Sequence, residues 1–185
     1  MSETLAALKR DHANIAKLLK ILESEILAIE VGKTPDYPLM REIMRYMAEH
    51  SDRFHHPKED LIFAQLLKRD PDVRADAEEL IQEHVVIRLS SIEFIGLITS
   101  TRADSVNARE QIGASGSHYI SALREHMFRE EKKLFPMAAE VLTPKEWKMI
   151  DTAIKTIDDP LFDEMTANDY QRLFHLIAEQ SDLFL

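Results

Sequence analysis

The chain has 185 residues, 45% of them hydrophobic and 30% charged, which suits a single globular domain with a sizeable core. Its formal net charge of −10, without any cluster of Lys and Arg, makes nucleic acid and anionic membrane surfaces poor partners. The absence of cysteine excludes disulfides, thiolate metal sites and a cysteine nucleophile.

Neither a signal peptide nor a membrane-spanning helix is predicted. Residues 1–10 are typical of the start of an amphipathic helix and lack the apolar core of a signal peptide. No apolar run approaches the roughly 18 residues expected of a helix that crosses a membrane. We therefore predict a cytoplasmic protein without a membrane partner.

Hydrophobic residues recur at steps of three and four along most of the chain, which predicts amphipathic helices and an all-α fold. Gly and Pro break this pattern near residues 32–38 and 70–71, and a turn is expected near residues 101–105. The breaks separate four long helical stretches, over about residues 5–29, 38–68, 73–98 and 112–141. Long helices with short connections favour an up-down-up-down four-helix bundle, which we place over residues 1–142.

The remaining residues, 143–185, are predicted to form a helical extension packed on the bundle. Thr143 and Glu146 make a capping-box pattern that opens a short helix. A last helix is expected over about residues 166–180.

Polar residues interrupt the apolar face of every long helix. His12, for example, lies four residues after Leu8 and three before Ile15, so it points inward. Each helix places one histidine in this way, and the second and fourth helices add a glutamate four residues later. The six residues are His12, His55, Glu59, His84, His126 and Glu130.

The spacing of these residues repeats. His12 precedes His55 by 43 residues, and His84 precedes His126 by 42. The chain therefore resembles two copies of one helix pair, which would bring four imidazoles and two carboxylates to the centre of the bundle. Bare carboxylates in an apolar core are costly, whereas metal cations would stabilise them.

This set of donors predicts a two-metal site. Imidazole together with carboxylate suits iron, manganese or zinc, and paired His and carboxylate ligands in a helix bundle favour iron. The alternative is a structural network of hydrogen-bonded polar residues in the core.

Two further residues are candidates for contact with a bound cofactor. His56 lies about 100° around the helix from His55, so it reaches the site only if Pro57 distorts that turn. Otherwise it supports a ligand or faces solvent. Tyr119 lies two turns before His126 on the same face, where it either hydrogen-bonds a ligand of the metals or is an ordinary core tyrosine.

Several other polar residues are interpreted as surface residues or as structural ones. His50 and His118 lie off the apolar faces and are expected at the surface, and His175 is interpreted as structural. Glu131 is expected on a solvated face, and Asp60 is expected to point away from the site.

The runs at residues 54–60 and 126–136, with Asp11–His12, resemble the signatures of hemerythrin-like, HHE cation-binding domains. The resemblance covers about residues 3–141. It implies two iron ions, joined by an oxo or hydroxo bridge, in a four-helix bundle with the six residues above as ligands. It also implies a small diatomic ligand such as O2 or NO.

The resemblance does not select one role, because such domains include oxygen carriers, oxygen or iron sensors, and proteins that repair nitrosative damage to iron–sulfur clusters. The oxygen carriers have a fifth histidine in a His-x-x-x-His pair on the third helix. Here the positions four residues from His84 are Leu80 and Arg88.

Three functions follow as hypotheses. The first is a di-iron protein that binds dioxygen, nitric oxide or a related oxidant for sensing, storage or detoxification. The second is a di-iron oxidoreductase that reduces nitric oxide or peroxide, or repairs iron–sulfur clusters, with electrons from another protein. The third is a metal-dependent regulatory module that meets a protein partner through its C-terminal helices.

Overall fold

A computed structural model describes residues 2–100, 105–154, 161 and 170–181, with the backbone alone at 51–54, 71 and 178–181. All described elements are helices, which confirms the predicted all-α class. The α-helices are α1 (Glu3–Glu30), α2 (Tyr37–Tyr46), α3 (His56–Arg69), α4 (Arg74–Thr99), α5 (Val106–Arg129), α6 (Phe135–Val141), α7 (Pro144–Ala153) and α8 (Gln171–Ser181). Two π-helices, η1 (Met47–His55) and η3 (Glu130–Leu134), and one 3-10 turn, η2 (Pro71–Val73), connect them.

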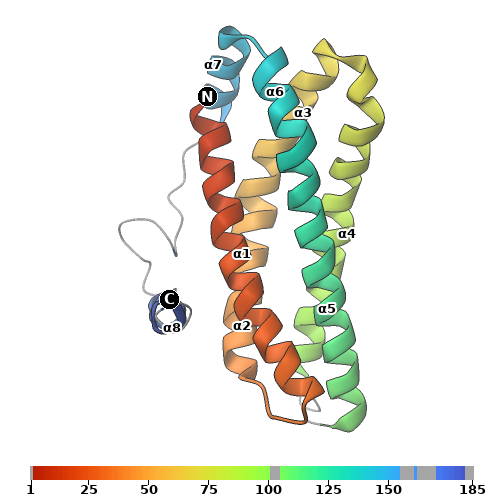
Figure 1. The fold of residues 1–185 in the computed structure, drawn as a ribbon, viewed down its shortest axis with the longest axis vertical. Helices are drawn as coiled ribbons and strands as arrows, with labels where there is room; N and C mark the ends of the chain where they lie inside the picture. The colour runs from red at the N-terminus through yellow and green to blue at the C-terminus, as the bar shows by residue number, and fades with distance from the viewer. Residues whose placement is uncertain (1, 101–104, 155–160, 162–169, 182–185) are drawn as a thin grey trace.

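The four rods of the bundle run up and down alternately (Figure 1), as predicted. The rods are α1, the series α2–η1–α3, α4, and the series α5–η3–α6. Helix α5 packs along both α1 and α4, and α2 packs against α1 and α4. Ser2, Asp36 and Ser105 are the N-caps of α1, α2 and α5, and their side chains accept hydrogen bonds from backbone N–H groups of the first turn. The predicted capping box of Thr143 and Glu146 is formed at the start of α7.

The second and fourth rods are not continuous α-helices, which periodicity alone does not predict. In each rod a π-helix ends two residues before a proline, η1 before Pro57 and η3 before Pro136. Proline has no N–H to donate to the carbonyl four residues earlier, and its ring crowds that carbonyl, which favours a wider turn there. The distortion expected at Pro57 therefore takes the form of a π-helix.

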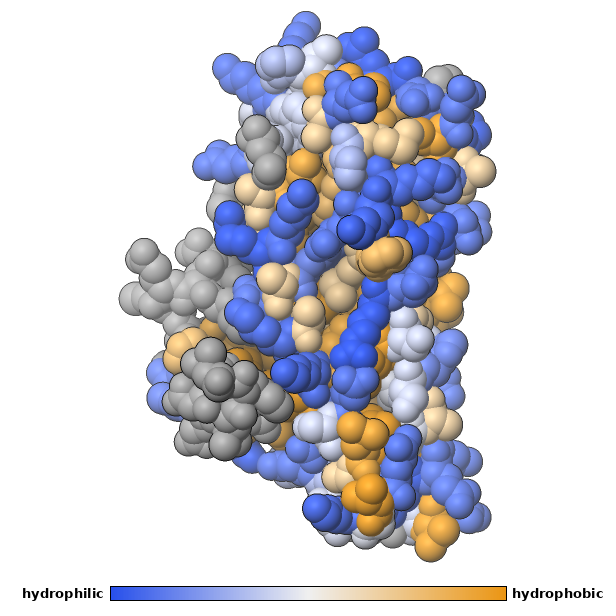
Figure 2. Space-filling model, in the orientation of Figure 1, coloured by the Kyte–Doolittle hydropathy of each residue, from blue (hydrophilic) through white to orange (hydrophobic). Residues whose placement is uncertain are grey.

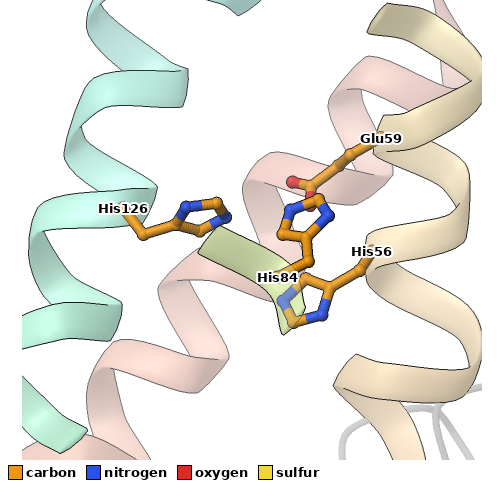
Figure 3. Close-up of side chains that lie close together, drawn as sticks. All are labelled: His56, Glu59, His84 and His126. Atoms are coloured by element: carbon orange, nitrogen blue, oxygen red, sulfur yellow. The ribbon is translucent and has the colours of Figure 1, made fainter. Parts of the chain in front are cut away.

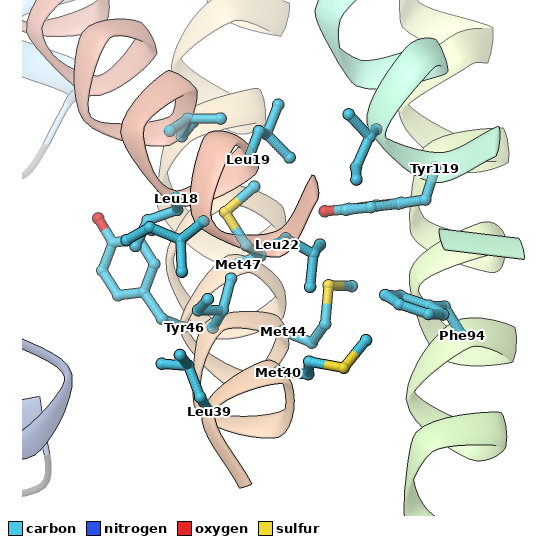
Figure 4. Packing of buried hydrophobic residues seen from close by; sticks show 14 of the residues in the cluster. Leu18, Leu19, Leu22, Leu39, Met40, Met44, Tyr46, Met47, Phe94 and Tyr119 are labelled. Atoms are coloured by element: carbon cyan, nitrogen blue, oxygen red, sulfur yellow. The ribbon is translucent and has the colours of Figure 1, made fainter. Parts of the chain in front are cut away.

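The core has two apolar clusters with a polar layer between them. The larger cluster fills the half of the bundle near α2 and includes Leu19, Met44, Phe94 and Tyr119 (Figure 4). The smaller one lies at the other end and includes Leu8, Ile62, Leu80, Leu134 and Phe135. Since His12 follows Leu8 and precedes Ile15 of the larger cluster, it lies between the two.

The C-terminal helices contact the bundle, α7 at α1 and α3, and α8 at α1 and α2. Buried Trp147 and Ile150 belong to the smaller cluster, and Leu173 and Ile177 belong to the larger one. The first residues of the predicted last helix, 166–169, and the turn at 101–104 lie outside the described residues. The boundary between bundle and extension at residue 142 stays a prediction.

Among the described residues, no helix combines the length and apolar character needed to span a bilayer. Figure 2 shows a mostly hydrophilic face with separate hydrophobic patches between charged side chains. The cytoplasmic location stays a prediction.

Gly116 allows α5 to approach α1 and α4 closely. A Cβ at this position would lie 2.5 Å from Cδ1 of Ile26 and 2.9 Å from Cζ of Phe94. We expect Gly116→Val to lower the free energy of unfolding by about 1–3 kcal/mol, because two buried side chains must move. Urea unfolding of the metal-free protein measures this.

Gly96 provides the matched control, because a Cβ there would meet nothing within 4 Å. Gly96→Ala is expected to raise stability by up to about 1 kcal/mol through helix propensity. An equal response of the two glycines would contradict the packing explanation.

Candidate metal centre

The structure brings all six predicted ligands together in the polar layer. They come from α1, from η1 with α3, from α4, and from α5 with η3, so every rod of the bundle contributes. All six are buried, at 7% relative exposure or less: His12, His55, Glu59, His84, His126 and Glu130.

One group of donors is formed by His12, His55 and Glu59. The Nε2 atoms of the two histidines lie 3.1 Å apart, and Oε1 of Glu59 lies 3.2 Å from His12 and 3.1 Å from His55. Donor atoms that occupy adjacent positions of one octahedral metal, at bond lengths of about 2.1 Å, are separated by about 3.0 Å. This triangle is therefore a preformed face for one metal ion.

A second group contains His84 and His126, and both glutamates span the two groups. The other oxygen of Glu59, Oε2, lies 3.4 Å from Nε2 of His84. Glu130 places Oε1 3.2 Å from His126 and 3.6 Å from His84, and its Oε2 lies 3.4 Å from His12. Each carboxylate thus has one oxygen beside each pair of histidines, as bridging ligands require.

His56 also lies in the centre, beside the second group. It is buried and its ring faces that of His84, with centroids 4.2 Å apart and an interplanar angle of 12°. Donor atoms of His56, Glu59, His84 and His126 all lie within 4.8 Å of one another, and Figure 3 shows their side chains. The sequence predicted that His56 reaches the site only if the helix is distorted near Pro57, and the π-helix η1 is such a distortion.

A carboxylate outside the centre accepts a hydrogen bond from Nδ1 of each of the four predicted histidine ligands. The pairs are His12 with Glu131 (3.0 Å), His55 with Asp11 (3.2 Å), His84 with Asp60 (3.1 Å) and His126 with Glu83 (2.9 Å). A proton held on Nδ1 leaves the lone pair of Nε2 free for a metal and fixes the orientation of the ring.

Two interpretations of the sequence were wrong here. Asp60 does not point away from the site, and Glu131 does not belong only to a solvated face. Both side chains are 45% exposed, yet each also reaches a histidine ring on a neighbouring rod. Helical position describes where Cβ points, whereas a flexible carboxylate can reach around the helix.

We expect Asp60→Ala to weaken metal binding at the second group about 10–100-fold, because supporting carboxylates contribute on that scale. The thermal unfolding midpoint of the metal-free protein should also fall, because the hydrogen bond to Asp60 helps to raise the pKa of His84. Competition with a chelator of known affinity measures the effect. Glu140→Ala, on an exposed residue of α6, is the control and should leave the affinity unchanged.

The charges of the centre change the protonation of its histidines. Burial alone would lower the pKa of His55, but the charge of Glu59 and hydrogen bonds to Asp11 and Glu59 raise this pKa to about 10. Burial would also lower the pKa of His84, but the hydrogen bond to Asp60 and the nearby carboxylates of Glu130 and Glu59 raise this pKa to about 11.

The pKa values of the two glutamates, Glu59 and Glu130, are lowered rather than raised. Burial would raise the pKa of Glu59, but the charge of His55 and contacts with the imidazoles of His12 and His84 lower this pKa well below its usual value. Without metal, His55 and His84 thus favour the imidazolium form and Glu59 favours the carboxylate form. Metal cations can take the place of those protons.

The donor atoms fit metal ions better than they fit a self-sufficient hydrogen-bond network. Within the described part of the chain, several buried atoms that face the centre have no hydrogen-bond partner: Oε2 of Glu59, Nε2 of His84 and His126, and both oxygens of Glu130. Buried polar atoms are seldom left in this state unless another partner, such as a cation, binds them.

Other predicted residues lie apart from the centre. Tyr119 is buried in the larger apolar cluster and its ring stacks near Phe94, with centroids 6.3 Å apart. Its position two turns before His126 places it roughly 10 Å away along α5. His118 and His175 are exposed.

The prediction that His50 lies at the surface was wrong. This residue is 2% exposed and stacks on Tyr46, with Nε2 3.8 Å from Asp11. Its spacing, three residues after Met47 and four before Phe54, already places it on the apolar face of the second rod.

A family model, the hemerythrin HHE cation binding domain, matches residues 3–138. The chain belongs to this family. The family assignment agrees with the buried His and Glu groups and shows that the hemerythrin HHE domain of this chain is a cation-binding fold. Among curated proteins no match to the chain was found.

Proposed function

We propose that this hemerythrin HHE domain holds two iron ions and binds a small diatomic oxidant, dioxygen or nitric oxide, for sensing, storage or detoxification. The observation that carries the proposal is the bridging position of Glu59 and Glu130 between two pairs of histidines. His12 and His55 would hold one ion, and His84 and His126 the other. Imidazole and carboxylate donors favour iron, with manganese or zinc as substitutes.

When bound, a di-iron pair supplies electrons and open coordination positions to a small ligand. The protein supplies the enclosure. Apolar clusters on both sides of the polar layer, with Ile15 and Leu123 on one side and Leu8 and Leu134 on the other, limit the access of water. Tyr119 lies in the larger cluster (Figure 4), where its ring forms part of the apolar enclosure on that side of the polar layer.

The test is anaerobic titration of the iron-loaded, reduced protein with dioxygen or nitric oxide, followed by absorption spectroscopy. We expect a saturating spectral change with a fixed number of ligand molecules per metal centre. Continued consumption of ligand in the presence of a chemical reductant would instead favour the di-iron oxidoreductase. A protein that carries iron but shows no spectral response to either gas would contradict both.

One set of contacts favours a metal-dependent protein interaction as a second role. Tyr170, just before α8, donates a hydrogen bond to Glu49 and packs edge-on against Tyr46. Tyr46 stacks on His50, which lies beside Asp11, the partner of the metal ligand His55. The C-terminal helices are therefore connected to the centre, and a protein partner that binds them would respond to metal loss.

A further inference from the structure

His56 has no role in the six-ligand centre, although it lies inside it. The ring of His56 stacks on that of His84, with centroids 4.2 Å apart, and lies edge-on to that of His126 at 6.0 Å. The neighbouring ring of His55 belongs to the first group.

The geometry of the second rod explains how adjacent histidines serve different metals. Glu59 is four residues after His55 and three after His56, and residues at both spacings are neighbours on a helix surface. Glu59 therefore lies between the two rings. Its Oε1 faces His55, and its Oε2 faces the group in which His56 lies.

The fourth rod lacks the corresponding imidazole. There His126 and Glu130 repeat the spacing of His55 and Glu59, and the residue equivalent to His56 is Met127. Met127 is buried in the larger apolar cluster. A thioether is a poor ligand for ferric iron compared with an imidazole. The two halves of the bundle are therefore alike in four histidines and two glutamates but differ at this position.

We infer that His56 is a fifth imidazole ligand, which binds the same metal as His84 and His126. This inference rests on the proposed di-metal centre. It makes the centre asymmetric, with three imidazoles on one metal and two on the other. The open coordination position, and hence the site of a small ligand, then lies on the metal held by His12 and His55.

The direct test counts metal-bound imidazoles in the intact protein. With cobalt(II) as the metal and 15N-labelled histidine, each bound imidazole contributes one N–H resonance shifted far outside the normal range by the paramagnetic ion. Wild-type protein should show five such resonances, and His56→Gln four. The control His118→Gln, at an exposed histidine, should keep five. Four resonances in both wild type and His56→Gln would overturn the inference, whereas a chain that binds no cobalt would remove the di-metal proposal itself.

A second measurement does not depend on the stability of one variant. Azide binds open positions of ferric iron, so titration of the iron-loaded protein counts them. We expect one azide per centre in the wild type and two in His56→Met, in which the halves become alike. Met127→Leu, three residues before Glu130, should keep the wild-type value. The same azide stoichiometry in His56→Met and wild type would show that His56 is not a ligand.

Discussion

Glu59→Ala is expected to lower the metal content of the chain from about two ions to less than one. Glu59 takes part in both groups of donors, because its two oxygens lie 3.1–3.2 Å from His12 and His55 and 3.4 Å from His84. Losing a bridging ligand removes a donor from each ion and also the negative charge that holds two cations together. Elemental analysis after equilibrium dialysis against ferrous or cobaltous ions measures the effect.

Two variants sharpen this prediction. Glu59→Asp keeps the charge but shortens the side chain by one methylene, so it should retain one ion better than two. Glu140→Ala removes an exposed glutamate and should leave the metal content unchanged. If Glu59→Ala kept a full complement of metal, the bridging assignment would be wrong.

The second large effect concerns pH: the stability of the metal-free protein should fall as the pH rises, whereas the affinity for metal should increase. In the metal-free protein the pKa of His55 is about 10 and that of His84 about 11, both above the value of 6.5 expected in the unfolded chain. A histidine whose pKa is raised in the folded chain stabilises the fold through its protonated form. This stabilisation is fully present below pH 6.5 and is lost as the pH rises toward the folded-state pKa. The free energy of unfolding should therefore fall by up to about 1.4 kcal/mol per pH unit for each such group between pH 6.5 and 10.

Metal loading should have the opposite dependence on pH. Because the ions displace protons from the same histidines, metal affinity should rise with pH over that range, and uptake at neutral pH should release protons. Thermal unfolding midpoints at pH 6.5 and 9, with and without metal, give the comparison. The metal-free midpoint should fall with pH while the shift caused by metal grows. Parallel behaviour of the two forms would show that the histidines are not shared between protons and metal.

The architecture was predictable because each long helix has a regular apolar face. The same periodicity identified the six inward donors, since a polar residue such as His84 between Leu80 and Ile87 has no other reason to face the core. Two matched spacings then indicated that the donors meet.

The distribution of donors between the two groups was not predictable from that periodicity. A regular helix separates His55 from His56 by about 100°, so only one of them was expected in the centre. With the π-helix η1 in this rod, both rings lie inward. Its signal was Pro57, which predicts a distortion but not its direction.

The supporting carboxylates were missed for a different reason. Asp60 and Glu131 are each the immediate neighbour of a predicted ligand glutamate, so helical position alone placed them outside the centre. Their hydrogen bonds to His84 and His12 connect different rods. Contacts of this kind depend on how the rods pack, which one sequence does not give.

The central claim, that four helices converge on two metal ions, is tested most directly by anomalous diffraction from crystals of the iron-loaded protein. We expect two peaks, about 3.5–4 Å apart, with Glu59 and Glu130 between them. A single peak, peaks at surface carboxylates, or none at the buried histidines would contradict it.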